Sequence, residues 1–270
     1  DTWHAMGQGA TTGSLVVTLE ALKEMHLTPE DIQLIQNDTK TCPDTGMAGA
    51  SRSLYMDGNA TIIAANKLLA AMRKEDGTLR TYDEMKAEGI ETKYLGRYET
   101  NTTPGLCRLD PNTGIGDPTP AFTYCLNLAE VEVDTKTGKT TVLKFTCVDF
   151  VGRIGNIDAV NGQAYSGIMH GIGFALKEDY ADVKKHANMF GAGTSYIKDV
   201  PDDINLIHID GAISDGPFGS SGASEAFQAS GHCAVLNGIY NACGVRIHEI
   251  PALPEKVKAG LDAIAKGEKP

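Results

Sequence analysis

The sequence of 270 residues lacks the patterns that mark several large classes of protein. Its net charge is −11 and no basic patch is visible, which argues against nucleic acid as a partner. No apolar run is long enough to cross a bilayer, and no signal peptide is recognised, so no membrane association is expected. With 41% hydrophobic and 22% charged residues, the composition is that of ordinary globular material in one or two domains.

The six cysteines are scattered, and no two of them form a CxxC pair. A zinc or iron–sulfur site made by this chain alone is therefore not expected. Four of the thiols, those of Cys125, Cys147, Cys233 and Cys243, lie in apolar patterns and are predicted to be core residues. A chain of this size does not need disulfides, which favours a reducing compartment, and we expect the protein to be cytoplasmic.

Common nucleotide and hydrolase motifs are missing as well. Neither GxGxxG nor GxxxxGK[ST] occurs, so neither a Rossmann nor a P-loop interpretation fits. Ser220, Ser221 and Ser224 are not part of a GxSxG elbow and lack a convincing histidine partner, which makes a serine hydrolase a poor interpretation.

What the sequence has instead is a repeated pattern of glycine- or serine-rich turns, each of which opens a helical run. The four turns lie near residues 7–12, 46–53, 152–158 and 216–225. A helix N-terminus offers unpaired backbone N–H groups and a positive dipole end, which together bind anions. One such turn indicates only a helix start, whereas four in one chain predict a cage of backbone donors around a large polyanionic ligand.

The remaining pattern divides the chain into helices and strands. Helical spacing covers residues 15–25, 54–72, 157–176, 226–240 and 250–266, and strands are expected at 31–36, 92–100 and 205–210. The alternating runs 121–133 and 139–149 predict a β-hairpin. Pro, Gly, Thr and Asp are concentrated in 101–120, which we interpret as a linker between lobes of residues 1–115 and 116–270.

Two features of these helices bear on function. The run 157–176 contains Gly162, Gly167, Gly171 and Gly173, whose cost in helix propensity must be offset by close packing or by close approach of a ligand. Glu225 lies in the first turn of the helix that follows the last glycine-rich turn. From the residues alone it is either an ordinary helix-start carboxylate or a base that faces a bound anionic group.

The order and spacing of these stretches resemble the C-terminal half of the molybdenum-binding region of the xanthine oxidase family, the molybdenum hydroxylases. The resemblance is carried by residues 6–9, 48–53, 156–173 and 222–226, and it extends from one end of the chain to the other. In detail the sequence is similar to the bacterial aldehyde oxidoreductases that carry molybdopterin cytosine dinucleotide.

This resemblance implies an α+β fold, with mixed sheets and packed helices in two lobes and a cofactor cleft between them. It implies that molybdenum is held by the pterin dithiolene rather than by the protein, close to Glu225, which matches the family's catalytic glutamate. Carried over by position, the residues expected to bind the cofactor are Gly7, Gln8, Gly9, Ser51, Arg52, Ser53, Arg153, Asn156, Gln163 and Ser221.

The implied reaction is the oxidation of an aldehyde to a carboxylic acid with water as the oxygen source, Glu225 being the general base at the molybdenum-bound hydroxyl or water. The resemblance also implies that the chain is part of a longer polypeptide. The missing part would hold two [2Fe–2S] clusters, and the enzyme would pass electrons to an external acceptor such as a flavodoxin or ferredoxin and would form a homodimer.

Three alternatives stay open. Many members of the family have glycine before the glutamate and proline after it, whereas this chain has Ser224 and Ala226, which points away from the purine-oxidising branch. The first alternative is therefore an enzyme that acts on an aldehyde. The second is another member of the family, which acts on an aromatic heterocycle or on carbon monoxide. A non-catalytic cofactor-binding module, in which the four turns are mere helix starts, is the third alternative.

Overall fold

The structure is a computed structural model that describes residues 4–36, 38–44, 48–100, 108–117, 119 and 121–268. The chain forms two compact units, each assembled from segments that are distant in sequence. The first unit comprises Asp1–Thr123, Val151–Ala159 and Asp210–Gly222, and the second comprises Tyr124–Phe150, Val160–Ile209 and Ala223–Pro270. These units differ from the linear division into residues 1–115 and 116–270, because two later segments belong with the N-terminal part.

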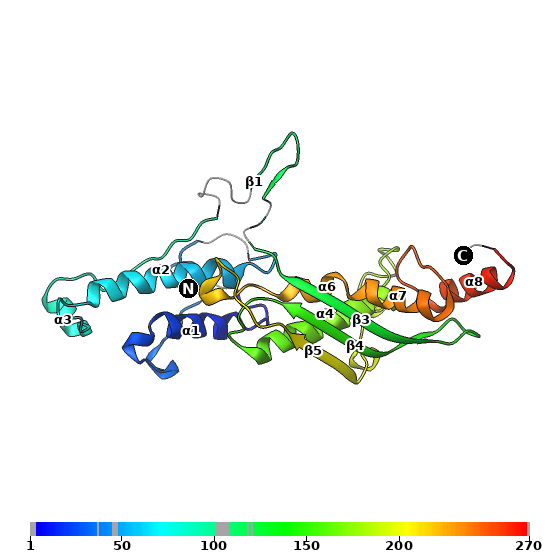
Figure 1. Ribbon diagram of the computed structural model, residues 1–270, viewed down its shortest axis with the longest axis horizontal. Coiled ribbons are helices and arrows are strands. Elements are labelled where there is room, and N and C mark those ends of the chain that lie inside the picture. Colours follow the sequence, from blue (N-terminus) through cyan, green and yellow to red (C-terminus); the bar gives the residue numbers. More distant parts are fainter. Residues whose placement is uncertain are drawn as a thin grey trace. The chain divides into compact units, whose positions relative to one another are not determined.

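The first unit is built on two helices, α1 (Ala10–Ala21) and α2 (Ser53–Met72), which lie side by side (Figure 1). Its core includes Leu22, Ala65 and Leu69. The remaining elements are short, namely η1 (Lys23–Met25), η2 (Pro29–Asp31), α3 (Tyr82–Ala87), the antiparallel pair β1 (Arg108–Leu109) and β2 (Gly116–Asp117), and η4 (Pro217–Gly219).

The strands predicted at residues 31–36 and 92–100 are wrong, since neither segment forms a strand. The second of them lies along helix α2 instead of beside another strand. A side chain at Gly96 would collide with the carbonyl oxygen of Ala60, and the Lys67 ammonium of α2 donates to the carbonyl oxygen of Leu95 at 2.9 Å. Its alternation therefore reflects packing on a helix and not pairing in a sheet. Part of the predicted linker, residues 101–107, 118 and 120, lies outside the described residues.

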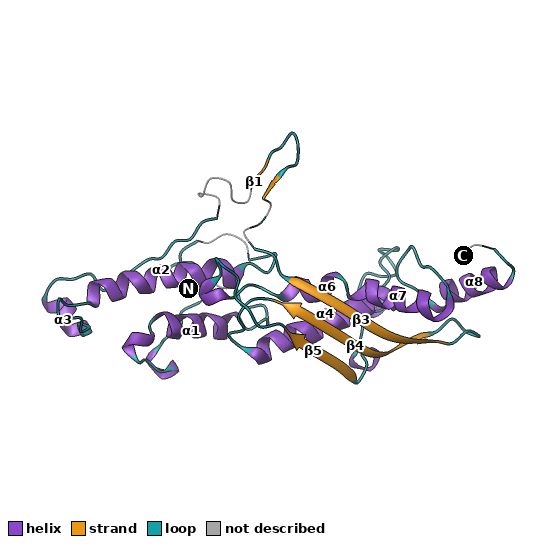
Figure 2. Cartoon of the chain, in the orientation of Figure 1, coloured by secondary structure: helices purple, strands orange, loops and turns teal. Residues whose placement is uncertain are grey.

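The second unit contains a mixed three-stranded sheet, drawn in orange in Figure 2. The strands β3 (Tyr124–Val133) and β4 (Thr140–Phe150) form the predicted antiparallel hairpin, which is thereby confirmed. Strand β5 (Asp203–His208) pairs with β4 in parallel. The helical elements are α4 (Ile157–Leu176), α5 (Met189–Ala192), η3 (Ile197–Asp199), α6 (Ser224–Ala229), α7 (Gly231–Cys243) and α8 (Pro254–Ala265).

The helix predicted over residues 226–240 is in fact two helices, because α6 ends before Ser230 and α7 begins after it. The Asn127 side-chain amide of β3 donates to the Ser230 hydroxyl at 2.9 Å, so the break is tied to the sheet. The glycines of α4 allow both helices to approach it closely. A Cβ at Gly167 would lie 2.6 Å from the Cβ of Phe227, and one at Gly171 would lie 2.9 Å from the Cα of Gly231.

Candidate functional site

Three of the four predicted turns meet within the first unit. The backbone N–H of Arg153 donates to the carbonyl oxygen of Gly219 at 2.9 Å, and that of Ser221 donates to the carbonyl oxygen of Val151 at 3.1 Å. A side chain at Gly222 would collide with the carbonyl oxygen of Ser51. The turns that carry Ser51, Arg153 and Ser221 are therefore contiguous, although more than 160 residues separate the first from the last.

The fourth turn adjoins them at the start of α4. Gly7 and Gly9 have φ angles of 103° and 86°, which favour glycine, and Gly9 precedes the first residue of α1. A Cβ at Gly9 would lie 3.3 Å from the Cβ of Ala159, whose backbone N–H donates to the Asn156 side-chain oxygen at 3.0 Å. Asn156 thus caps α4 beside the Gly7–Gly9 turn.

The Gln8 side chain folds back onto its own turn. Its side-chain oxygen accepts from the backbone N–H of Met6 at 2.6 Å, and its side-chain nitrogen donates to the carbonyl oxygen of His4 at 2.5 Å. Both halves of the amide are therefore engaged in holding the turn, and the turn's outward groups are those of its backbone.

The segment before α2 has an unusual backbone conformation. Ala50 and Ser51 both have φ of 53°, and Arg52 follows at φ −91° and ψ −7°. The backbone N–H of Arg52 donates to the carbonyl oxygen of Gly49 at 3.3 Å, which closes this turn. The left-handed conformation costs a residue with a side chain roughly 1–2 kcal/mol, and such strain is concentrated at functional sites. Ser53 begins α2, and the Arg52 side chain is exposed.

In the second unit, Gln163 of α4 and the start of α6 are joined. The Ser224 hydroxyl donates to the Gln163 side-chain oxygen at 2.8 Å, and Glu225 is the next residue. Glu225 is exposed, and α6 begins at Ser224 after Ala223 without a side-chain cap. The fully buried Phe227 anchors this short helix against Gly167 of α4. The Glu225 carboxylate is thus presented at a surface by a helix whose other side is fixed in the core.

One buried polar network escaped the sequence analysis. His208 of β5 places its Nδ1 2.7 Å from the Asp149 carboxylate of β4 and its Nε2 2.8 Å from the Asn161 side-chain oxygen of α4. Burial raises the pKa of Asp149, and the neighbouring His208 opposes part of that rise. The sequence pattern could have indicated that Asp149 is buried. Asp149 follows Phe145 and Cys147 at the alternate positions of the strand, which point into the core.

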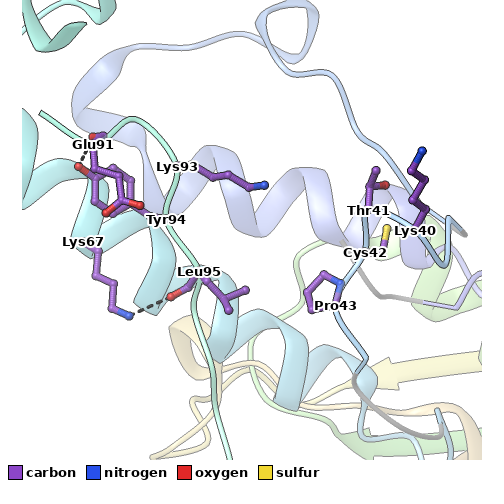
Figure 3. Close-up of a pocket in the computed structure, with 9 residues that line it drawn as sticks. All are labelled: Lys40, Thr41, Cys42, Pro43, Lys67, Glu91, Lys93, Tyr94 and Leu95. Carbon is purple, nitrogen blue, oxygen red and sulfur yellow. Dashed lines mark hydrogen bonds between the residues drawn. The ribbon is translucent and has the colours of Figure 1, made fainter. Parts of the chain in front are cut away.

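A cavity of about 650 Å³ lies elsewhere in the first unit (Figure 3). It is lined by Lys40, Thr41, Cys42, Pro43, Lys67, Glu91, Lys93, Tyr94 and Leu95. Figure 3 shows the Lys67 ammonium donating to the backbone of Leu95, so one of its three lysines is already engaged. None of the predicted cofactor or catalytic residues lines this cavity.

The described part of the chain contains neither a metal site built from its own side chains nor a membrane-spanning helix. No group of three or more His, Cys, Asp or Glu side chains there is arranged to hold a metal ion. No helix among those residues is both long and apolar enough to traverse a membrane.

The clustered helix-opening turns are typical of a domain that binds an anionic cofactor. Similarity to known proteins identifies the family to which this domain belongs. Residues 2–201 match the Molybdopterin cofactor-binding domain. The chain belongs to this family, within the xanthine oxidase family of molybdenum enzymes. The α+β fold expected from the resemblance is confirmed by the same relatives.

Three relatives describe its position in the family. The aldehyde oxidoreductase of Megalodesulfovibrio gigas is 42% identical over 261 residues, which is 97% of this chain and 28% of that protein. The crystal structure of the aldehyde oxidoreductase from Desulfovibrio desulfuricans superposes with a TM-score of 0.91 at 45% identity, over 96% of this chain and 28% of that one. A probable hypoxanthine oxidase of Escherichia coli K12 is 28% identical, over 97% of this chain and 29% of that protein. The chain therefore spans less than a third of the length of these relatives.

Proposed function

We propose that the chain is part of a molybdenum-dependent aldehyde oxidoreductase, which oxidises an aldehyde to a carboxylic acid with water as the oxygen source. The observation that carries the proposal is the 42% identity to an aldehyde oxidoreductase, against 28% to a probable hypoxanthine oxidase over an equal share of the chain. The presence of Ser224 and Ala226 around Glu225 supports the same choice.

The turns of the first unit fit a cofactor with a pyrophosphate, as molybdopterin cytosine dinucleotide has. The turn before α2 places Ser51, Arg52 and Ser53 at the N-terminus of a long helix, where the helix dipole favours a phosphate. Gly7 has no atom within 4 Å of an added Cβ, so its backbone is open to a ligand, and Gln8 and Gly9 hold that turn in shape. Arg153, Asn156 and Ser221, which lie on the contiguous turns, are proposed to complete this set.

Gln163 is proposed to bind the cofactor through its amide nitrogen. Its side-chain oxygen is taken by the Ser224 hydroxyl, which fixes the orientation of the amide and leaves the nitrogen as the donor. When bound, the cofactor supplies the two-electron redox chemistry of the metal.

Glu225 is proposed to be the general base. The conversion of an aldehyde and water into a carboxylic acid releases two electrons and two protons, so the attacking water oxygen must lose protons. An exposed carboxylate on a helix anchored by Phe227 is positioned to accept one of them. General-base assistance of this kind contributes about 10²–10⁴-fold to a rate.

The whole enzyme, on this proposal, contains further parts beyond these 270 residues. They would carry two [2Fe–2S] clusters and pass electrons to an external acceptor such as a flavodoxin or ferredoxin. A cytoplasmic homodimer is proposed on the same grounds.

The test is turnover by the intact enzyme purified with its cofactor. Molybdenum and the nucleotide released from the pterin should be present in equal amounts, and that nucleotide should be the cytosine form. Under anaerobic conditions with a dye as electron acceptor, an aldehyde should be converted into its acid, which identifies water as the oxygen source. Turnover confined to hypoxanthine, another heterocycle or carbon monoxide would overturn the aldehyde assignment, and cofactor without any turnover would leave only a binding module.

A further inference from the structure

The sheet of the second unit has one covered face and one open face. On the covered face, Phe145, Cys147 and Asp149 of β4 are almost completely buried. Helix α7 lies against this face, since Gly238 approaches Val131 and Gly231 approaches Phe145. Helix α4 joins it through the contact of Asn161 with His208.

The open face consists of the alternate residues of the same strands, which the strand register arranges in rows across the sheet. The rows between Tyr124 and Glu130 of β3 are Tyr124–Phe150, Leu126–Val148–Ile207, Leu128–Thr146–Asn205 and Glu130–Lys144–Asp203. The first two rows are wholly aromatic or aliphatic, the third is mixed and the fourth is wholly charged. One face of one sheet thus changes from apolar to charged along its length.

The charged row at one end of the open face is suited to contact with water. The Lys144 ammonium lies 3.2 Å from the Asp203 carboxylate, and Glu130 is exposed beside them. An antiparallel sheet with one solvated face ordinarily alternates apolar residues toward the core with polar residues toward water. The row of Glu130, Lys144 and Asp203 obeys this rule and serves as a comparison for the other end, although Leu143 at the adjacent bulge is 50% exposed.

The apolar end breaks the rule on the same strands. Tyr124, Leu126 and Leu128 are 64%, 55% and 57% exposed, and Ile207 is 43% exposed. The rings of Tyr124 and Phe150 lie 6.4 Å apart, so these side chains form one patch rather than separate points. Contiguous apolar patches rimmed by polar residues mark surfaces that bind a protein, a membrane or a ligand. We name the patch formed by Tyr124, Leu126, Leu128, Val148, Phe150 and Ile207 the open-face patch.

We propose that the open-face patch is a docking surface for a segment of the same enzyme that lies outside these 270 residues. The inference rests on the proposed function to the extent that the chain is part of a larger enzyme. The part of the M. gigas relative that matches this chain is only 28% of that protein, so the remainder is long enough to supply a segment that covers the patch. The occupant should present an apolar helix or strand face that ends before the charged row of Glu130, Lys144 and Asp203, which stays in contact with water.

A second copy of this chain is a poorer occupant. The chain carries a net charge of −11, and a second sheet would bring another Glu130 and Glu132 to the same interface. Like charges placed together across an interface oppose association, so the sheet's own charged border disfavours pairing with itself.

Site-specific photo-crosslinking in the intact enzyme tests the proposal. The photoreactive residue p-benzoyl-phenylalanine replaces Tyr124, an aromatic position, and in a matched variant it replaces Glu132 at the charged end of the same strand. After irradiation and digestion, mass spectrometry should find Tyr124 joined to a peptide from outside the 270 residues, with no comparable adduct from Glu132. A third variant with the probe at Leu128 repeats the measurement if replacement of Tyr124 prevents assembly.

Two results would overturn the proposal. One is an adduct between Tyr124 or Leu128 and a peptide of these 270 residues, either in a second copy or elsewhere in the same chain. The other is labelling by solvent products alone, equal to that at Glu132. The molybdenum content and aldehyde turnover of each variant are recorded separately. An active enzyme without the adduct refutes the docking surface alone, and the adduct without aldehyde turnover refutes the proposed activity alone.

Discussion

Two glycines of helix α4 provide a matched test of how this helix is used. Gly162 has no atom within 4 Å of an added Cβ, whereas at Gly167 the added atom would lie 2.6 Å from the Cβ of Phe227 and 2.8 Å from its carbonyl carbon. The same substitution, glycine to alanine, therefore meets open space at one position and the backbone of α6 at the other.

The two free-energy changes should differ in sign. Alanine is favoured over glycine in a helix by about 0.5–1 kcal/mol, so Gly162→Ala should stabilise the chain by that amount. Gly167→Ala gains the same propensity but adds overpacking, which typically costs about 1–3 kcal/mol, so the net result should be destabilisation of up to about 2 kcal/mol. For a chain of this size each kcal/mol corresponds to roughly 2–4 °C in Tm.

The functional consequences should also separate. Packing does not account for Gly162. If the proposed cofactor approaches α4 closely at this glycine, Gly162→Ala should lower the molybdenum content of the purified enzyme. Gly167→Ala should keep the cofactor but displace α6 and with it Glu225, which lowers kcat. Thermal unfolding, metal analysis and turnover of both variants check these expectations. Equal shifts in Tm, or stabilisation by Gly167→Ala, would refute the steric reasoning.

Two further variants test other residues. Gln163→Ala removes the partner of Ser224 and the proposed cofactor donor, so metal content should fall more than Tm; a lower Tm with full metal content would indicate a purely structural role. Asp149→Asn tests the buried pair with His208. Because burial raises the pKa of Asp149, the contribution of its proton to stability is complete below its ordinary pKa of about 3.9 and is lost as pH rises through the raised value. The Tm of the parent relative to Asp149→Asn should therefore fall with rising pH in that window and then level off, and a difference that is constant across it would contradict this.

Elements with strong periodicity were predictable from the sequence. The helical spacing of residues 157–176 predicts α4. The alternation of apolar and polar residues on both sides of the turn at 134–138 predicts the β3–β4 hairpin. The break at Ser230 was not predictable, because serine is compatible with a helix and the break is tied to Asn127 in a distant strand. The strand prediction for residues 92–100 was wrong because an extended segment that packs on a helix can show the same alternation of residues as a strand.

The candidate site was predictable in its parts but not in its grouping. Each turn could be found from its glycines and serines, but the contact of Gly222 with Ser51 joins segments far apart in the chain. Nothing local in either segment specifies that contact, which is why the two compact units could not be drawn from composition. The engagement of Gln8 with its own turn was equally inaccessible, because the sequence does not show where an amide side chain points.

The role of Glu225 as general base is the central claim, and Glu225→Gln measured against Glu255→Gln tests it most directly. Both glutamates are exposed and lie in the first turn of a helix, α6 and α8 respectively, so each substitution removes a carboxylate that the helix dipole favours, typically by about 0.3–1 kcal/mol. The measurement is the rate at which an aldehyde reduces the molybdenum of the intact enzyme, with metal content confirmed for each variant. If Glu225 is the general base, Glu225→Gln should slow this reduction by about 10²-fold or more, while Glu255→Gln should leave it unchanged. Reduction of the Glu225→Gln enzyme at the parent rate would show that Glu225 is not the base.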